Sequence, residues 1–256
     1  PVVDKDSVVV GLHCLENMMD GKSIDNLAVI MAGGEGVRLR PYTEKRPKPM
    51  VEVGGKPILE YLLDKLKENG FSKILISINY LGEIIEEHFE DGSKFGLKIS
   101  YIREKKKLGT AGALSLAKKR LLQTEAPILV SNADIISDLN YQNLLSFHTK
   151  EEAAATMVVK NHTIQNPYGV VAIEGHNFKG MEEKPTYSSL ICAGIYILNP
   201  DVMVFLKENE YCDMPELFTR MAEDNRPVKV FPTHEKWVDV GKASDLDYAN
   251  SLYGHK

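Results

Sequence analysis

One stretch decides the fold: Asn26-Leu27-Ala28-Val29-Ile30-Met31-Ala32-Gly33-Gly34-Glu35-Gly36-Val37-Arg38-Leu39-Arg40-Pro41. Residues 27–31 are all apolar and are soon followed by glycine, which is typical of a strand buried on both faces of a parallel sheet. Three glycines and two arginines follow. Glycine lets backbone N–H groups approach phosphate oxygens closely, and arginine adds positive charge. The stretch therefore predicts a buried strand that ends in an anion-binding loop.

The chain on either side of this stretch alternates apolar strands with amphipathic helices. Apolar residues recur at helical spacing from Pro57 to Asn69, and Gly70 ends the pattern. Alternation of this kind is typical of βαβ units with right-handed crossovers. We therefore expect an α/β fold with a Rossmann-like, mostly parallel sheet flanked by helices. The further elements expected are strands at 74–78, 99–102 and 127–130 and helices at 83–89 and 111–122.

The two ends of the chain differ from this pattern. Beyond Ala153 strands become more frequent, at 155–159, 169–173, 193–198 and 228–231. We expect them to form a mixed or antiparallel part that closes over the site at the anion-binding loop. Residues 1–23 read as two short strands and a helix at 15–19, which is too little to fold alone. The predicted organisation is thus an N-terminal β extension, 1–23, that packs on one main domain, 26–256.

Composition excludes several classes of protein. The 256 residues are 43% hydrophobic and 26% charged, as in an ordinary globular domain, and the net charge of -5 argues against nucleic-acid binding. Cys14, Cys192 and Cys212 are scattered without a CxxC pair, so neither a zinc site nor a disulfide framework follows. Neither a membrane-spanning apolar run nor a signal peptide is recognisable. We expect a cytoplasmic protein that binds no membrane.

Two familiar phosphate loops do not fit the glycine stretch. A dinucleotide loop needs a third glycine where Leu39 stands, and a Walker loop needs serine or threonine where Pro57 follows Gly55-Lys56. What remains is a glycine loop with Arg38 and Arg40, followed by further cations at residues 46 and 48. The alternative interpretation of these residues is a plain glycine turn whose basic side chains are solvated and bind no ligand.

Three further segments lie where a ligand would be expected, beyond strand ends. Asp134, after an apolar strand, suits Mg²⁺, although an aspartate there is as often a turn residue. The glycine-rich segment 108–114 predicts either an anion or base site or a plain helix start. Asn79 also follows a strand, and its position alone leads us to expect that it faces a nucleotide base.

At this point the motifs resemble a known family. Ala32-Gly33-Gly34-x-Gly36-x-Arg38-Leu39-Arg40-Pro41 with Pro47-Lys48-Pro49-Met50 resembles the signature of the sugar-phosphate nucleotidyltransferases, which include mannose-1-phosphate guanylyltransferases and glucose-1-phosphate thymidylyltransferases. The resemblance covers residues 26–253 and implies a glycosyltransferase-A-like nucleotidyltransferase fold. Val37 replaces the usual threonine, and Ala133 a glycine. The other matching motifs are Leu108-Gly109-Thr110-Ala111-Gly112, Asn132-Ala133-Asp134, Tyr168-Gly169-Val170-Val171, Glu183-Lys184-Pro185, Ala193-Gly194-Ile195-Tyr196 and Trp237-x-Asp239-x-Gly241.

The resemblance implies a role for each matching residue. Asp134 and Asp239 would hold Mg²⁺ and, with Arg38, Lys48 and Lys184, form the catalytic set. The nucleotide would be bound by Ala32, Gly33, Gly34, Gly36, Arg38, Lys48, Gly109, Thr110, Ala111 and Asn132, and the sugar phosphate by Tyr168, Gly169, Glu183, Lys184, Ala193 and Gly194.

The reaction implied joins a nucleoside triphosphate to a sugar 1-phosphate, giving a nucleotide-sugar and pyrophosphate. The motifs look closest to guanylyltransferases for mannose-, heptose- or glucosamine-type 1-phosphates, so GTP is the favoured nucleotide. Thymidylyl, uridylyl or cytidylyl transfer stays open, as does a homo-oligomer. An inactive sensor should have lost Lys48, Asp134 or Asp239, and all three are present. A choline-phosphate cytidylyltransferase would not be expected to combine Glu183-Lys184-Pro185 with Trp237-x-Asp239.

The N-terminal segment resembles something different. Pro1-Val2-Val3-Asp4, Val8-Val9-Val10-Gly11-Leu12 and Met18-Met19 look like the end of a CBS motif. Such motifs occur in tandem and bind adenine nucleotides. The resemblance implies that this chain is the catalytic part of a larger protein, regulated by an adenine nucleotide.

Overall fold

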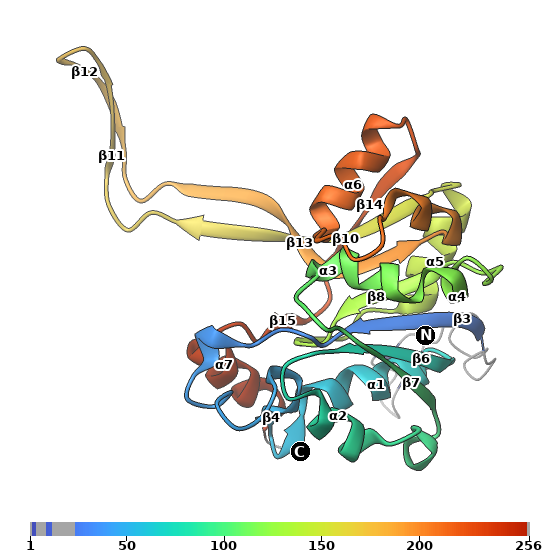
Figure 1. The fold of residues 1–256 in the computed structure, drawn as a ribbon. Helices are drawn as coiled ribbons and strands as arrows, with labels where there is room; N and C mark the ends of the chain where they lie inside the picture. Colours follow the sequence, from blue (N-terminus) through green and yellow to red (C-terminus); the bar gives the residue numbers. More distant parts are fainter. Residues whose placement is uncertain (1, 4–8, 12–23, 255–256) are drawn as a thin grey trace.

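The apolar run becomes the central strand β3 (Ile24–Met31) of a seven-stranded sheet in the computed structural model, which describes residues 2–3, 9–11 and 24–254 (Figure 1). The strand order is β14-β10-β13-β8-β3-β6-β7, and β13 alone runs against the others. The mostly parallel, mixed sheet expected from the sequence is confirmed. The other strands are β6 (Phe71–Ile78), β7 (Lys98–Arg103), β8 (Ile128–Asn132), β10 (Ala155–Gln165), β13 (Thr186–Leu198) and β14 (Val228–Thr233).

Helices cover both faces of the sheet. Ala28 and Ile30 of β3 face one core cluster, with side chains of α1, α2 and α5, while Leu27 and Val29 face a second, with side chains of α3, α4 and α6. Because successive strand residues point to opposite faces, a run buried on both sides must be apolar throughout. The helices are α1 (Ile58–Glu68), α2 (Gly82–Phe89), α3 (Gly109–Gly112), α4 (Lys118–Leu121), α5 (Tyr141–Lys150), α6 (Met214–Glu223) and α7 (Ala243–Tyr253).

A third, smaller cluster fixes the segments around the site. It joins Leu39 of the glycine loop to residues of α7 and of two short ribbons. One ribbon pairs β9 (Ile135–Ser137) with β15 (Trp237–Asp239), which brings Asp239 opposite Ile135. The other pairs β4 (Glu52–Val53) with β5 (Lys56–Pro57). The C-terminal part of the chain thereby packs against the loop that follows β3.

The continuous helix expected at residues 111–122 is instead broken into α3, a 3-10 turn (Ala113–Ala117) and α4. Residues 111–115 are all buried, and a Cβ atom on Gly112 would lie 2.5 Å from the carbonyl oxygen of Glu210. The small side chains let this segment press against residues 210–212 on one side and the sheet on the other. Tertiary packing has therefore overridden the helical pattern.

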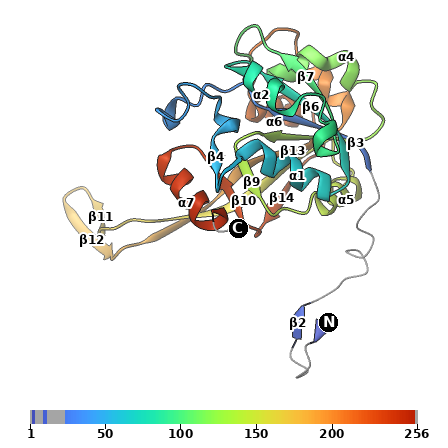
Figure 2. The same cartoon turned by 90° about the horizontal axis from the view of Figure 1, so that it is seen from below.

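A two-stranded ribbon projects from the body of the domain (Figures 1 and 2). We call residues 161–190 the arm. Its inner part continues β10 and β13, and its outer part pairs β11 (Val170–Glu174) with β12 (Asn177–Glu182). The expectation that the strands beyond Ala153 close over the site is therefore wrong for this segment. Strand pairing carries the arm outward, whereas the sequence pattern revealed the strands but not their direction.

The two N-terminal strands expected from the sequence are β1 (Val2–Val3) and β2 (Val9–Gly11), an antiparallel pair. The helix expected at 15–19 lies outside the described residues. Within the part of the chain that the structure describes, we find no helix that is both long and apolar enough to cross a membrane.

Candidate active site

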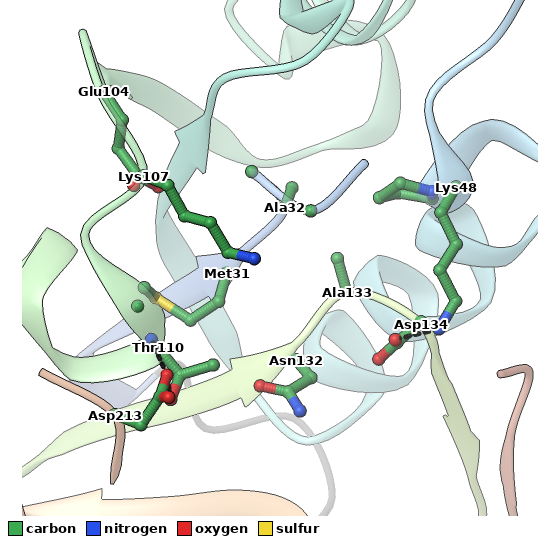
Figure 3. A pocket seen from close by; sticks show the side chains of 14 residues that line it. Met31, Ala32, Lys48, Glu104, Lys107, Thr110, Asn132, Ala133, Asp134 and Asp213 are labelled. Atoms are coloured by element: carbon green, nitrogen blue, oxygen red, sulfur yellow. Dashed lines mark hydrogen bonds and ion pairs between the residues drawn. The ribbon is translucent and has the colours of Figure 1, made fainter. Parts of the chain in front are cut away.

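A pocket opens beyond the carboxyl ends of β3, β7 and β8 (Figure 3). Ligands of open α/β sheets bind at this edge, because loops from neighbouring parallel strands converge there. Its lining combines glycine-loop backbone with charged side chains from both halves of the domain. The lining residues are Met31, Ala32, Gly33, Gly34, Lys48, Pro49, Glu104, Lys107, Gly109, Thr110, Asn132, Ala133, Asp134 and Asp213.

The glycine loop is held by its own backbone and by Thr43. Gly36 has a φ of +62°, and a Cβ atom there would lie 2.9 Å from Thr43 Cγ2, so glycine is needed on both counts. The buried Thr43 hydroxyl donates to the carbonyl of Gly36 at 2.8 Å. Val37, where the family usually has threonine, is 55% exposed and its hydroxyl-free side chain lies on the surface of the loop.

Lys48 lies between the two carboxylates that the sequence singled out. Its Nζ forms an ion pair with Asp134 and lies 3.7 Å from Oδ1 of Asp239. The lysine is held in a 3-10 turn between Pro47 and Pro49, and its side chain is only 12% exposed. The N–H of Val240 donates to the carbonyl of Asp134 at 3.1 Å, which ties the two acidic segments together. Three residues far apart in sequence thus converge, as the motifs predicted.

The charges around Asp239 act in opposite directions. Burial, followed by the charge of Asp134, raises the pKa of Asp239, while Lys48 and Arg38 act to lower it. Arg38 is exposed, and its Nη2 would lie 3.7 Å from a Cβ atom built on Gly241. Two carboxylates in one partly buried place repel each other, and the cations offset that repulsion.

The acidic pair fits a divalent metal ion. Oδ1 of Asp134 is buried and has no hydrogen-bond partner among residues 24–254, so one oxygen of this carboxylate remains available to a ligand. The described residues contain no group of three or more acidic, histidine or cysteine side chains placed for a metal. An ion held here by two aspartates would therefore complete its shell with substrate or water oxygens, as Mg²⁺ commonly does.

Glu104 is a pocket residue that the sequence analysis missed. It follows β7 directly, and its Oε1 accepts a hydrogen bond from Ser77 at 2.9 Å, with Oε2 3.3 Å from the N–H of Leu108. Burial raises the pKa of its carboxyl, and these hydrogen bonds act to lower it. A Cβ atom on Gly33 would lie 2.6 Å from Oε1, so glycine is needed to admit this carboxylate. Its place one residue beyond a strand end was the available signal.

Asp213 is the second residue missed. Its Oδ1 accepts from the N–H of Thr110 at 3.0 Å and lies 3.3 Å from the Thr110 hydroxyl, which in turn accepts from the N–H of Met214. The N–H groups of Ala111 and Gly112 both donate to the carbonyl of Cys212. The glycine-rich segment therefore uses these N–H groups to bind residues 212–213. Gly109 and Thr110 line the pocket, while Ala111 is buried behind them.

Asn79 stands beside this end of the pocket. Its Nδ2 donates to the carbonyl of Glu104 at 3.1 Å, and its Cβ would be 3.2 Å from a Cβ on Gly33. The side chain thereby supports the backbone that carries Glu104. A direct contact of Asn79 with a base stays a prediction.

The residues expected to bind the sugar phosphate fall into two groups. Ala193 and Gly194 lie at the body of the domain, where a Cβ atom on Gly194 would be 2.8 Å from Nδ2 of Asn132, and Trp237 donates to the carbonyl of Ala193. The others lie on the arm, outside the pocket lining: Tyr168, Gly169, Glu183 and Lys184.

Comparison with known proteins agrees with this arrangement. Residues 27–256 match the family model described as "Nucleotidyl transferase". The chain is 36% identical over 233 residues to "Probable mannose-1-phosphate guanylyltransferase 1" of Oryza sativa subsp. japonica, and 34% identical over 234 residues to "Mannose-1-phosphate guanylyltransferase catalytic subunit beta" of Danio rerio. Each alignment covers 88% of this chain, which spans 64% of the length of either relative.

Solved structures share the fold. HddC from Yersinia pseudotuberculosis, complexed with GMP-PN, superimposes with a TM-score of 0.69 at 25% identity, covering 89% of this chain and 99% of the other. A putative glucose-1-phosphate thymidylyltransferase from Bacillus anthracis superimposes with a TM-score of 0.73 at 23% identity, covering 90% and 96%.

Proposed function

This chain belongs to the nucleotidyl transferase family, and we propose that it joins a sugar 1-phosphate to a nucleoside triphosphate, releasing pyrophosphate. One observation carries the proposal: Lys48 lies between Asp134 and Asp239 at the edge of a pocket lined by glycine-loop backbone. Nucleotidyl transfer needs positioning and charge stabilisation more than covalent chemistry. Cations beside two metal-binding carboxylates supply that chemistry.

We infer that GTP is the preferred nucleotide, and Glu104 is the structural reason. Guanine presents two adjacent donors, N1–H and the N2 amino group, to one carboxylate. The Glu104 oxygens accept from Ser77 and Leu108 and still have capacity for further donors, since an ionised carboxylate offers about four lone-pair sites. Uracil and thymine offer a single N–H between two carbonyls, which a carboxylate repels. The GMP-PN complex of HddC, a relative in fold, agrees with a guanine ligand.

In the proposed reaction a phosphate oxygen of the sugar 1-phosphate attacks the α-phosphorus in line, and pyrophosphate leaves. Lys48 and Arg38 bind the triphosphate oxygens and offset the charge that develops on them. The phosphate nucleophile is already anionic near neutral pH, so the protein needs no general base. Mg²⁺ bound by Asp134 and Asp239 would supply further charge stabilisation at the phosphates. The sugar phosphate would lie on the side of Ala193 and Gly194, next to Asn132.

The direct test is a grid of four nucleoside triphosphates against mannose, heptose, glucosamine and glucose 1-phosphates, read by pyrophosphate release with and without Mg²⁺. We expect turnover with GTP, loss of turnover in chelator, and loss in Asp239→Asn with the fold intact by circular dichroism. Preference for UTP or dTTP would overturn the role of Glu104. Binding of a nucleotide without release of pyrophosphate in any pair would identify a sensor and overturn the proposed reaction.

We also propose, on the sequence resemblance alone, that residues 1–23 belong to a CBS domain and that an adenine nucleotide regulates the enzyme. The family match begins at residue 27, so this segment lies outside it. Titrating AMP and ATP into the transferase assay of the natural polypeptide should change its rate. An unchanged rate, together with no binding of either nucleotide by calorimetry, would refute the proposal.

A further inference from the structure

One lysine of the pocket has no part in the chemistry described so far. Lys107 belongs to the pocket lining, and Figure 3 shows its side chain pointing into the pocket. Among residues 24–254 no carboxylate lies within ion-pair distance of its ammonium, whereas Lys48, the other lysine of the lining, lies between two carboxylates. A pocket cation without such a partner in the ligand-free protein is available to an acceptor atom of a ligand.

The loop that carries Lys107 is closed by Glu104. Oε2 of Glu104 accepts from the N–H of Leu108 at 3.3 Å, so the first residue of segment 104–108 is tied to its last. Oε1 accepts from the Ser77 hydroxyl at 2.9 Å, which ties the same carboxylate to β6. Lys107 is the residue before Leu108 in this closed loop. One short loop of the pocket wall thus carries both a fixed hydrogen-bond acceptor and a cationic donor.

Asp213, the other carboxylate that feels the charge of Lys107, is engaged elsewhere. Its Oδ1 accepts from the N–H of Thr110 at 3.0 Å, and its Oδ2 accepts from the hydroxyl of Tyr211 at 2.6 Å. Burial acts to raise the pKa of Asp213, but these hydrogen bonds, together with the charge of Lys107, lower it below its ordinary value. Lys107 therefore acts on Asp213 through space without an ion pair. The donors of its ammonium remain for a ligand.

Lys107 lies at the end of the pocket away from the phosphate chemistry. Figure 3 shows Lys48 and Asp134 on one side of the pocket and Glu104 with Lys107 on the other. A triphosphate bound at Lys48 would therefore leave the far side to the base. The atoms within reach of Lys107 are then those on the edge of the base.

The edge of guanine offers one acceptor beside two donors. O6 accepts, whereas N1–H and the N2 amino group donate. Adenine in the same pose would set its N6 amino group where O6 lies and a lone pair where N1–H lies. A loop with a cation and a carboxylate matches the pattern of guanine and opposes that of adenine. Contacts from lysine or arginine to O6 and N7 of guanine are the commonest specific contacts that proteins make to bases.

We propose that Lys107 is a specificity-determining residue for the nucleotide: its ammonium donates to O6 of guanine, while Glu104 accepts from N1–H and the N2 amino group. This role deepens the proposed function and rests on its choice of GTP. A site built to hydrogen-bond a particular group discriminates strongly against an analogue that lacks it, because the polar group of the site is then left unpaired.

Nucleotide analogues test the contact with O6. ITP keeps O6 and N1–H but lacks the N2 amino group, and 2-aminopurine riboside triphosphate keeps the amino group but lacks O6. Lys107→Met keeps most of the apolar stem and removes the ammonium. We expect it to weaken binding of GTP and of ITP by about 10- to 100-fold each, the worth of a hydrogen bond to a charged group, and to change binding of the 2-aminopurine nucleotide little. Lys107→Arg keeps a cationic donor and should retain most of the affinity for GTP.

Calorimetric titration with Mg²⁺ present measures binding, and the fluorescence of 2-aminopurine gives a second readout for that nucleotide. Lys106→Met is the matched control, because it makes the same change of net charge at an exposed neighbouring lysine outside the pocket lining. Its affinity for GTP should equal that of wild type. Equal losses for all three nucleotides in Lys107→Met would mean that the lysine binds the phosphates, and would overturn the proposal. So would the absence of any loss, or an equal loss in Lys106→Met.

Pyrophosphate release in the same variants separates the role of Lys107 from the proposed reaction. If binding depends on O6 as expected but no sugar 1-phosphate gives pyrophosphate, the reaction is overturned and the role of Lys107 stands. If wild type turns over GTP and Lys107→Met binds it equally well, the role of Lys107 is overturned and the reaction stands. A wild-type chain that binds UTP or ATP more tightly than GTP overturns both the choice of GTP and the role of Lys107.

Discussion

Replacing Lys48 with methionine should move metal affinity and turnover in opposite directions. Methionine keeps most of the apolar stem but removes the charge that lies between Asp134 and Asp239. In the ligand-free protein Lys48 competes with any metal ion for these carboxylates. Lys48→Met should therefore bind Mg²⁺ or Mn²⁺ more tightly in the absence of nucleotide. Turnover should fall, because Lys48 no longer stabilises charge on the phosphates.

The size of both effects follows from the geometry. A unit charge about 4 Å from another is worth about 4 kcal/mol at an effective dielectric constant near 20. The side chain of Asp239 is 46% exposed, so solvent screens most of that energy. We take about 1.4 kcal/mol as a lower value, which corresponds to a gain of roughly tenfold in metal affinity. Loss of one charge-stabilising donor commonly lowers kcat about 10²- to 10³-fold.

Calorimetric titration of Mn²⁺ into the nucleotide-free protein measures the affinity, and pyrophosphate release measures turnover. Lys45→Met is the matched control, since it makes the same change of charge at an exposed lysine three residues earlier. The reasoning is refuted if Lys48→Met binds metal no more tightly than wild type. It is equally refuted if Lys45→Met gains as much affinity, because the effect would then come from net charge.

Three further changes test other parts of the site and the core. Glu104→Gln should lower kcat/KM for GTP by about 10- to 100-fold, the worth of a hydrogen bond to a charged group, while UTP turnover falls little; equal losses for both nucleotides would contradict guanine recognition. Thr110→Val removes the hydroxyl that binds Met214 and should cost about 1 kcal/mol of stability and raise KM for nucleotide more than it lowers kcat; a kcat effect alone would count against a positioning role. Leu63→Ala in the fully buried core should lower the free energy of unfolding in urea by about 2–5 kcal/mol, and a loss below that range would mean the helix packs loosely.

The sheet and its first helices were readable from the sequence because their patterns are local. Ile58, Leu62 and Leu66 recur on one face of α1, and the structure buries all three. The unbroken run in β3 likewise required burial on both faces. Residues 111–122 failed as a single helix because their small side chains pack against residues 210–212, about 100 positions later. A local pattern carries no information about that contact.

The residues of the site were predictable, or not, for the same reason. Lys48, Asp134 and Asp239 could be named from motifs, and the structure brings them together through the pairing of β9 with β15. Glu104 could have been named only from its place directly after a strand end. Asp213 could not be named, because its importance comes from facing the pocket and no local pattern distinguishes it from the many exposed acids of the chain. The direction of the arm was hidden for a similar reason, since alternation predicts a strand but not what lies beside it.

The place of Lys48 also explains how two carboxylates can share a partly buried site before any substrate arrives. Burial and the neighbouring Asp134 raise the pKa of Asp239. Two ionised aspartates without a nearby cation would cost electrostatic free energy in such a place. Lys48 offsets that cost while the pocket is free. A divalent cation bound with a triphosphate would give the aspartates another positive partner, and Lys48 could then exchange them for phosphate oxygens at little net electrostatic cost. Without Lys48 the carboxylates lose a competing cation, so they should bind metal more tightly. The phosphates lose a stabilising charge at the same time, so the proposed transfer should fail.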